Sequence, residues 1–459
     1  MFIGRENELA ILKENYRFNG FKMVVVYGRR RVGKSYLLQH FFRNLDAKVV
    51  AFQAIANDVS LSIEAFRDAL FEAYPPEYDI NLDTWKKCFQ YLVGQLGEDK
   101  AVICIDEINY IFKEDPTFAS LLQSVIENQL KEKNVLLIVC GSNVTTIEEE
   151  ILADNSPLYG RRNLSIKLQE FDYRKAAEFY PNYSHEDKVI AYSVFGGKGK
   201  NLSCIDPSKS IEENIIDQIL TPGGPLADEI DLLLKDDFRE TGFYKELLYI
   251  MSMGNTSFGD IVNKSGQSSA KVSIYLEKLI DLRMVERVRI GSKKNDVRYF
   301  IQDNFFSFYF RFVYKKRGIL NILVAPKAFY DRFIKSDLYS FVGLKFENIC
   351  EQYIIRKSYL GELDFIPTEY GKYYGKHRDG STFDIDVFFR DETTAMCGEC
   401  KFTNKEFSIA DADELVENAK EISAKEIRYY VFSKSAVKDS VLQKYPFLTL
   451  VSLEDLFRE

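Results

Sequence analysis

Apolar runs with the length of strands punctuate the first third of the chain. Three of them, FKMVVVY, AVICIDE and NVLLIVCGSN, occupy residues 21–27, 101–107 and 134–143. Each is rich in β-branched residues, and each ends in glycine or polar residues, which is typical of a buried strand that presents functional groups at its tip. A helical pattern follows the first run. This part of the chain is therefore predicted to be a mixed α/β domain.

The middle of the chain has a helical pattern. From residue 173 to about 248 the pattern is broken only at FGGKGK and TPGGP, which predicts a small helical lid. Residues 256–301 then contain a short helix capped by Ser257, a longer helix with Val272, Leu276 and Leu279, and two β-like runs joined by GSKKND. That order predicts a winged helix, whose second helix is able to enter a major groove. Winged helices also dock proteins, so the partner of this segment can be either nucleic acid or protein.

A β-hairpin is predicted near the C-terminus. Residues 383–390 and 395–402 alternate apolar and polar side chains with period two, and residues 391–394 form the loop. If Arg390 pairs with Ala395, the same register sets Val387 opposite Gly398, Asp386 opposite Glu399 and Asp384 opposite Lys401. The predicted apolar face consists of Phe383, Ile385, Val387, Phe389, Met396, Cys400 and Phe402. The other face carries two carboxylates and a lysine.

Length and composition indicate a soluble globular protein of three or four domains. The chain has 459 residues, of which 46% are hydrophobic and 28% charged. It contains no apolar run long enough to span a membrane and begins without a signal segment, so we expect a cytoplasmic protein with no membrane partner. The seven cysteines occur mostly in apolar surroundings, which favours reduced thiols. Cys397 and Cys400 form a CxxC, but on a strand they point to opposite faces, which disfavours a metal or redox pair.

Charge is unevenly distributed along the chain. The net charge of −8 argues against a surface that is basic all over. Between Lys264 and Arg298, however, nine Lys or Arg stand against four Asp or Glu, which leaves +5 there and −13 elsewhere. Any nucleic-acid contact is therefore expected in the winged-helix segment, at residues such as Lys271 and Lys278, although both can also belong to an ordinary solvated face.

A phosphate-binding loop is the strongest motif. After the first strand the spacing G-x-x-x-x-G-K-S occurs, and the predicted ATP-binding residues are Gly28, Arg29, Arg30, Arg31, Val32, Gly33, Lys34 and Ser35. Backbone N–H groups and the helix N-terminus surround the phosphates, Lys34 reaches the β and γ phosphates, and Ser35 holds Mg²⁺.

Three further pairs of residues are predicted to complete the ATP site. Asp106 at a strand tip is placed to reach the magnesium, and Glu107 to activate the attacking water. Ser142 and Asn143 follow the next strand and are candidates for sensing the γ-phosphate, with a plain polar turn as the alternative. Arg161 and Arg162 are candidates for an arginine finger acting in cis or from a neighbouring subunit of a homo-oligomer; solvated arginines are the alternative.

These motifs resemble a known family. FIGRENEL, YGRRRVGKS, CIDEIN, CGSN and PLYGRR are similar to the archaeal-type ATPases, AAA-related P-loop proteins of the additional-strand class. In such proteins the GRE segment packs near the adenine. The resemblance spans essentially the whole chain and implies a P-loop ATPase domain (1–171), a helical lid (172–240), a winged helix (241–320) and a C-terminal domain similar to PD-(D/E)XK nucleases (321–459). One departure is FGGKGKNL, where many relatives have Gly-Gly-x-Pro.

The nuclease resemblance assigns roles to the hairpin. Such enzymes need an acid on one strand, a (D/E)-x-K on the next and often a glutamate on the preceding helix, because the carboxylates share Mg²⁺. The matching residues are Asp386 and Glu399 as metal ligands and Lys401 for the developing charge, with Glu347 as the helix glutamate. Asp384 replaces the usual Glu of Glu-Ile-Asp. The alternative is an ordinary charged sheet face.

The sequence thus predicts an ATP-hydrolysing switch coupled to an Mg²⁺-dependent nuclease that acts on nucleic acid, with DNA favoured. One rival is an ATP-controlled DNA-binding regulator whose C-terminal domain only binds. The other is a signalling ATPase in which the winged helix docks protein.

Overall fold

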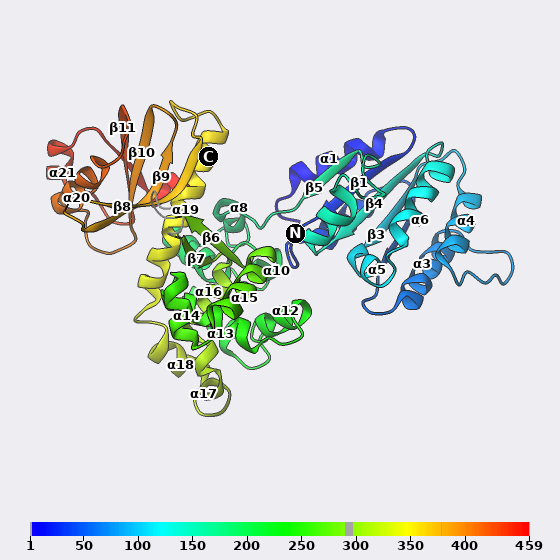
Figure 1. Ribbon diagram of the computed structural model, residues 1–459, viewed down its shortest axis with the longest axis horizontal. Helices are drawn as coiled ribbons and strands as arrows, with labels where there is room; N and C mark the ends of the chain where they lie inside the picture. Colours follow the sequence, from blue (N-terminus) through cyan, green and yellow to red (C-terminus); the bar gives the residue numbers. More distant parts are fainter. Residues whose placement is uncertain (1, 290–296, 378, 459) are drawn as a thin grey trace. The chain divides into compact units, whose positions relative to one another are not determined.

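The computed structural model describes residues 2–289, 297–377 and 379–458, and the chain divides into two compact units (Figure 1). Unit 1 is Met1–Glu170 with Lys198–Lys200, and unit 2 is Phe171–Gly197 with Asn201–Glu459. Unit 1 ends one residue before the predicted boundary after residue 171. The predicted boundaries after residues 240 and 320 fall inside unit 2 and stay predictions. GSKKND lies outside the described residues.

Unit 1 is built on a five-stranded sheet with the order β2-β3-β4-β1-β5, in which every pair of neighbours is parallel. The strands are β1 (Lys22–Tyr27), β2 (Lys48–Gln53), β3 (Ala101–Asp106), β4 (Val135–Gly141) and β5 (Leu164–Lys167). β1, β3 and β4 are buried almost throughout, which explains their continuous apolar sequences. β4 lies between β1 and β3.

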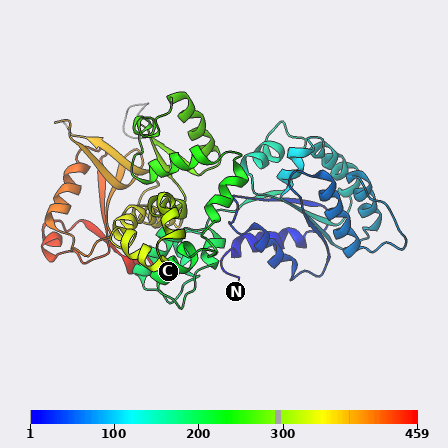
Figure 2. The same cartoon turned by 90° about the horizontal axis from the view of Figure 1, so that it is seen from below.

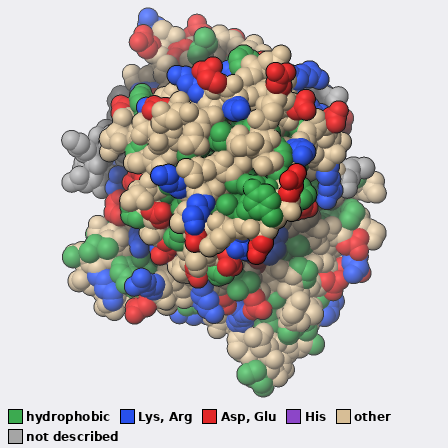
Figure 3. Space-filling model, turned by 90° about the vertical axis from the view of Figure 1, so that its right-hand side faces the viewer, with side chains coloured by type: hydrophobic (Ala, Val, Ile, Leu, Met, Phe, Trp, Pro, Cys, Tyr) green, Lys and Arg blue, Asp and Glu red, His purple; other side chains and the backbone are tan. Residues whose placement is uncertain are grey.

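Helices cover both faces of this sheet, as Figure 2 also shows. Leu12 of α1 (Glu6–Arg17) and Phe41 of α2 (Lys34–Phe42) pack in one core cluster with β1. Phe66, Phe89 and Phe118 belong to helices that form the core on the other face. Those helices are α3 (Val59–Ala73), α4 (Trp85–Gln95), α5 (Ile108–Glu114), α6 (Phe118–Val125), η1 (Ile126–Leu130), α7 (Val144–Ile147) and η2 (Glu148–Leu152). Acidic and basic side chains are interspersed over the face drawn in Figure 3.

Unit 2 begins with helices. They are α8 (Tyr173–Ala177), α9 (His185–Phe195), α10 (Gly199–Ser203), α11 (Ile211–Asn214), η3 (Ile215–Leu220), α12 (Glu229–Asp237) and α13 (Gly242–Ser252), with the start of α10 counted in unit 1. Next come α14 (Phe258–Ser265), α15 (Ser269–Asp281) and the antiparallel strands β6 (Val285–Arg289) and β7 (Val297–Ile301). Ser257 and Ser268 accept hydrogen bonds from backbone N–H groups three residues later and so cap α14 and α15. The two helices and two strands expected here are thereby confirmed.

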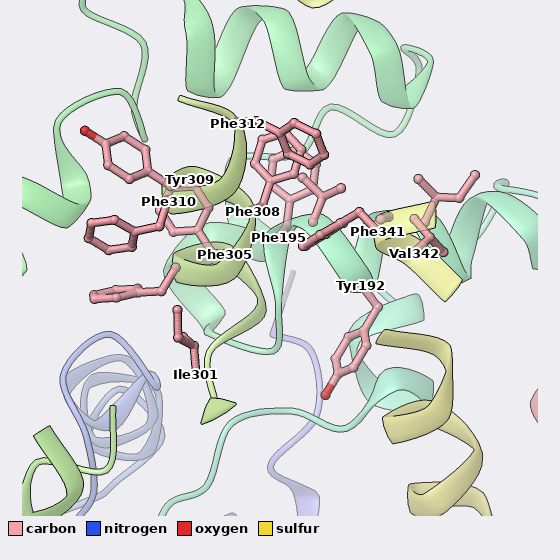
Figure 4. Close-up of a cluster of buried hydrophobic side chains, with 14 of the residues drawn as sticks. Tyr192, Phe195, Ile301, Phe305, Phe308, Tyr309, Phe310, Phe312, Phe341 and Val342 are labelled. Carbon is pink, nitrogen blue, oxygen red and sulfur yellow. The ribbon is translucent and has the colours of Figure 1, made fainter. Parts of the chain in front are cut away.

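A phenylalanine-rich helix forms the centre of unit 2. α16 (Asn304–Phe312) has the sequence NFFSFYFRF, and all its residues except Arg311 are buried. Figure 4 shows rings of α16 beside Phe195 of α9 and Phe341 of α19 (Leu338–Tyr359). The Phe308 and Phe341 ring centroids lie 5.8 Å apart. Short helices η4 (Tyr314–Lys316), α17 (Arg317–Ile322) and α18 (Pro326–Phe333) connect α16 to α19.

The C-terminal part of unit 2 is a second five-stranded sheet, with the order β12-β11-β10-β9-β8. Its elements are β8 (Glu369–Lys376), β9 (Thr382–Arg390), β10 (Thr394–Lys401), α20 (Ile409–Ala419), β11 (Glu426–Ser433), α21 (Asp439–Lys444), β12 (Leu448–Ser452) and α22 (Leu453–Phe457). β10, β11 and β12 are parallel, whereas β8, β9 and β10 form an antiparallel meander. α19 and α20 both contact β9 and β10, within two different core clusters. No described helix is long and apolar enough to cross a membrane.

The predicted hairpin is confirmed in its strands and in its register near the turn. Arg390 pairs with Ala395 and Val387 with Gly398, as the sequence indicated. The regular pairing ends there, so the direct pairs of Asp386 with Glu399 and Asp384 with Lys401 do not form.

A bulge in β9 is the reason. Against β8, Gly371 pairs with Phe388 and Tyr373 with Ile385, so Lys372 alone stands opposite Asp386 and Val387. One extra residue inverts the alternation of side chains that follow it.

The single apolar face predicted for this hairpin is consequently wrong. Val387 and Phe389 pack in the core cluster that contains α19 residues, whereas Phe383 and Ile385 pack in the one that contains α20 residues. Both faces of the sheet are buried.

Candidate functional site

The phosphate loop follows the C-terminal end of β1, next to the C-terminal end of β5. Gly28 has a φ of 155°, and a Cβ there would lie 2.3 Å from the carbonyl oxygen of Leu168. Leu168 N donates a hydrogen bond to Tyr27 O, which holds the chain after β5 against this position. Gly33 has a φ of 100°, in the region that favours glycine. Both motif glycines are thus required by the backbone.

Two hydrogen-bonded side chains face the loop. The buried Lys34 ammonium donates to the carbonyl oxygens of Gly28 and Arg29, at 2.9 and 3.1 Å. Ser35 Oγ donates to Asp106 Oδ2 at 2.8 Å, so the hydroxyl and the carboxylate predicted to hold Mg²⁺ are adjacent. Oxygen donors of this kind suit that ion.

Arg5, in the GRE segment, braces the same loop. Its guanidinium donates to the carbonyl oxygen of Val32 at 3.1 Å and to that of Gln169 at 2.5 Å. It also pairs with Glu8. Sequence reasoning assigned this segment only to the surroundings of the adenine, because the partner at Gln169 is 164 residues away.

Glu107 is held at the tip of β4. Ser142 Oγ donates to Glu107 Oε2 at 2.5 Å, and Ser142 N lies 3.2 Å from the same oxygen and 3.1 Å from Asn109 Oδ1. Asn143 Oδ1 instead accepts from Thr146 N and caps α7. Of the two sensor candidates, Ser142 is therefore the one joined to Glu107.

Arg161 and Arg162 are not brought to the phosphate loop. They precede β5 at the end of the sheet where Asn163 pairs with Met23, whereas the loop follows Tyr27 at the opposite end of β1. Arg161 forms an ion pair with Glu127, and Arg162 donates to Leu152 O. An arginine finger acting from a neighbouring subunit stays a prediction.

A segment from later in the chain completes this neighbourhood. Lys198–Lys200 belong to unit 1, and Lys200 N donates to the carbonyl oxygen of Arg31 at 3.3 Å. Gly197 precedes these residues. A Cβ atom added to Gly197 would lie 2.1 Å from the carbonyl oxygen of Phe171. FGGKGK therefore needs its second glycine for a close backbone approach.

Four charged residues converge in the C-terminal domain. The Lys372 ammonium lies 3.0 Å from Glu347 Oε2, 2.9 Å from Asp384 Oδ2 and 3.1 Å from Asp386 Oδ1. Asp386 Oδ2 accepts a hydrogen bond from Cys400 N at 3.0 Å, so its side chain also reaches β10. Sequence reasoning found the three acids but missed Lys372.

Glu399 and Lys401 form a neighbouring pair. Lys401 Nζ lies 2.5 Å from Glu399 Oε1 and 3.9 Å from Asp411 Oδ1 of α20. Burial opposes the charged form of Lys401, but Glu399 and Asp411 outweigh it and raise the pKa of the ammonium. Lys401 is accordingly a permanent cation rather than a proton acceptor.

Asp386 links the two groups electrostatically. Burial raises the pKa of Glu347 to about 7, and the Asp386 carboxylate adds to the shift. Burial and the same carboxylate raise the pKa of Glu399 to about 7. Asp386 thus acts on an acid of α19 and on an acid of β10.

The acids fit a divalent cation in one respect. Glu347, Asp384 and Asp386 already surround a single positive charge, the Lys372 ammonium, which marks where a cation is stabilised. Among the described residues, no three Asp, Glu, His or Cys side chains are arranged as a ready metal cage. These carboxylates would therefore have to close on an ion after Lys372 leaves.

The cysteines of the CxxC do not form a pair. Cys397 packs in the cluster with α20 residues, whereas Cys400 packs against the other cluster. The prediction that they point to opposite faces is confirmed.

Lys271 and Lys278 lie on the exposed side of α15. Lys271 Nζ is 4.8 Å from the Phe243 ring centroid and donates to Gln267 Oε1, and Lys278 Nζ is 6.0 Å from the Phe238 ring. The helix also exposes Ile274 and Glu277, so its outer surface is mixed.

Comparison with known proteins agrees with the phosphate loop and the parallel sheet, which define a P-loop ATPase domain. Residues 2–205 match the family described as "ATPase domain predominantly from Archaea". Residues 309–422 match the family described as "Archaea bacterial proteins of unknown function". Residues 2–205 are therefore similar to archaeal-type ATPase domains, and residues 309–422 are similar to the second family.

Individual relatives extend this similarity. Protein MJECL04 of Methanocaldococcus jannaschii, which is uncharacterized, is 28% identical over 406 residues, which cover 88% of each chain. The uncharacterized ATP-binding protein MJ0423 of the same organism is 40% identical over 48 residues, 10% of this chain and 81% of that protein. The walker-type ATPase PABY2304 of Pyrococcus abyssi is 16% identical with a TM-score of 0.49, over 68% of this chain and 96% of that one.

Proposed function

We propose that this protein is an ATP-hydrolysing switch whose C-terminal domain is an Mg²⁺-dependent nuclease. The observation that carries the nuclease assignment is the bulge in β9. It places Asp386 beside Glu347 of α19 and within electrostatic reach of Glu399 on β10, with Lys401 next to Glu399. The order helix, three-stranded meander, helix and parallel strand is consistent with the PD-(D/E)XK resemblance.

In the ATPase domain the chain's own groups divide the reaction between them. Lys34 and the loop N–H groups bind the phosphates, while Ser35 and Asp106 would hold the magnesium, which would supply neutralisation of the phosphate charge. Glu107 accepts a proton from the attacking water as the bond between the γ-phosphorus and the bridging oxygen breaks, leaving ADP and phosphate. Ser142 orients the Glu107 carboxylate.

In the C-terminal domain the acids and the lysine have separate tasks. Asp386, Glu399 and Glu347 would hold the divalent ion, which would supply Lewis-acid activation of water and of the scissile phosphate. Lys401, which stays protonated, stabilises the negative charge that develops on the phosphate. Asp384 lies on the exposed side of the group and neutralises part of the charge of Lys372.

The substrate is proposed to be nucleic acid, with DNA favoured, bound through the winged helix. The helices α14 and α15 and strands β6 and β7 support a winged-helix assignment, and the net charge of +5 over residues 264–298 supports phosphate contact. The mixed outer surface of α15 favours modest affinity.

One observation favours a second candidate. Lys372 already forms ion pairs with three of the acids, and such contacts are expected of a C-terminal domain that binds no metal. In that case the protein is an ATP-controlled DNA-binding regulator, and the C-terminal domain only binds.

Cleavage and ATP turnover test the two assignments separately. With Mg²⁺ or Mn²⁺, full-length protein should cut duplex or single-stranded DNA, and Asp386→Ala should abolish the cutting while Glu392→Ala, an exposed acid in the same hairpin, should not. Lys34→Ala should abolish ATP binding, while Lys13→Ala on α1 should not. Absence of metal-dependent cleavage from the wild type on DNA and RNA alike would overturn the nuclease assignment and favour the second candidate.

A further inference from the structure

Lys372 occupies a position that the bulge creates. It is the one residue of β8 that stands opposite two residues of β9, Asp386 and Val387. Bulges re-aim side chains and are frequent beside active sites. Here the bulge turns Asp386 toward the α19 side, where Lys372 and Glu347 also point. The backbone at the bulge therefore puts the Lys372 side chain on the same face as these acids.

The contacts of Lys372 are those of an internal counter-ion. Its Nζ lies within 3.1 Å of oxygens from three carboxylates on α19 and β9, and its side chain is 23% exposed. An exposed surface ion pair joins two groups and contributes little to stability. A lysine shared by three carboxylates, one of them the 13% exposed Asp386, is instead a charge on which the local structure depends.

A divalent cation needs the same oxygens. Mg²⁺ and Mn²⁺ bind carboxylate oxygens at about 2.0–2.2 Å, so an ion held by Glu347 and Asp386 would lie where the ammonium now lies. Two positive charges do not share that space, because their repulsion at such a separation is large in a poorly solvated site. Binding of the ion and retention of Lys372 in its present position exclude each other.

We propose that Lys372 is a displaceable counter-ion that competes with the metal for Glu347 and Asp386 and thereby sets the metal affinity of this domain. This inference rests on the proposed metal-dependent function of the same site. Lys372 is a positioning residue: it holds the carboxylates together in the metal-free protein and leaves when the ion enters. Only molecules in which Lys372 has left the acids can bind the ion. The apparent association constant for the metal is therefore the intrinsic constant multiplied by the fraction of such molecules.

Direct Mn²⁺ binding tests the competition. Full-length nucleotide-free protein carrying Ser35→Ala, which weakens the metal site of the ATPase domain, is titrated with Mn²⁺, and free Mn²⁺ is followed by electron paramagnetic resonance. Adding Lys372→Met should lower the apparent dissociation constant about tenfold, as expected if Lys372 is in place in about nine molecules of ten. Lys372→Arg should stay close to the starting protein.

A matched control separates this effect from a change in net charge. Lys376 lies on the same strand, four residues away, and is exposed. Lys376→Met removes the same charge and should leave Mn²⁺ affinity within about twofold. Equal tightening in both variants would overturn the inference in favour of a general electrostatic effect.

Thermal melting gives a second readout. Without metal, Lys372→Met should melt at a lower temperature than the starting protein, because three carboxylates lose their shared cation. Saturating Mn²⁺ should raise the variant's melting temperature more than that of the starting protein. If the starting protein binds Mn²⁺ and Lys372→Met binds it no more tightly, the inference is wrong and the metal site stands. If neither protein responds to Mn²⁺, the metal site itself is wrong.

Discussion

The hydroxyl of Ser142 donates a 2.5 Å hydrogen bond to Glu107 Oε2, which joins the tip of β4 to the residue that follows β3. Glu107 has a left-handed backbone conformation, with φ 53° and ψ 40°. A non-glycine residue in this region is strained, and such strain is common at functional positions. The carboxylate is thus fixed by its own backbone and by one neighbouring strand.

Ser142→Ala should slow ATP hydrolysis roughly tenfold with little change in ATP affinity, because a positioned base contributes about 10²–10⁴ and only its orientation is lost. Glu107→Gln should slow turnover further and still bind ATP. Steady-state turnover and equilibrium binding of a fluorescent ATP analogue measure the two effects. A Ser142→Ala protein with wild-type kcat would show that the hydrogen bond does not prepare Glu107 for catalysis.

Replacing Lys271 and Lys278 with Gln should weaken DNA binding and make it less dependent on salt. Each phosphate contact contributes about 0.9 to the slope of log K against log salt, so loss of both lowers its magnitude by about 1.8. Fluorescence anisotropy at several salt concentrations measures the slope. Lys327 and Lys335 are the control pair, since both are exposed and form ion pairs with Glu212 and Asp331. An unchanged slope in the Lys271 and Lys278 variant would favour protein docking at α15.

Lys401→Ala should suppress cleavage about a hundredfold or more while leaving Mn²⁺ binding largely in place. The reason is that removing one preorganised group that stabilises developing charge costs about 10²–10³ in kcat. Cleavage under single-turnover conditions and Mn²⁺ titration measure the two properties. Loss of Mn²⁺ binding together with cleavage would mean that Lys401 supports the fold of the site instead of the reaction.

Stability should fall as pH rises through the range in which Glu351 ionises. Burial raises the pKa of Glu351 to about 7, and the Glu286 carboxylate adds to the shift. Because this value exceeds about 4.3, the ordinary value of an unfolded glutamate, the folded state binds more protons between the two. The stabilising contribution of Glu351 to the free energy of unfolding is fully present below about pH 4.3 and is lost as pH rises through about 7.

Glu351→Gln should therefore melt at a higher temperature than the wild type at pH 8 and show a flatter profile between pH 5 and 8. Thermal melting monitored by circular dichroism measures both. Glu392→Gln, an exposed acid in the hairpin loop, should follow the wild-type profile. Parallel profiles for wild type and Glu351→Gln would show that Glu351 ionises as an ordinary surface glutamate.

Several features were predictable from the sequence because their causes are local. The phosphate loop is contiguous from Gly28 to Ser35, so its glycines and lysine can be recognised within one short segment. The strands and near-turn register of the 383–402 hairpin follow from alternation with period two and a four-residue loop, and these were confirmed. Asp106 and Glu107 were recognisable because a buried strand ends at them.

What only the tertiary structure decided depends on partners that are distant in the chain. A single extra residue in β9, visible only in its pairing with β8, inverts the faces of the hairpin and removes the expected pairing of Asp386 with Glu399. The same pairing brings Lys372 to the acids. The sequence by itself determined which segments could hold ATP and which acids could gather. The packing of strands and helices determined which charges meet, because one residue of register moves every side chain on a strand to the opposite face.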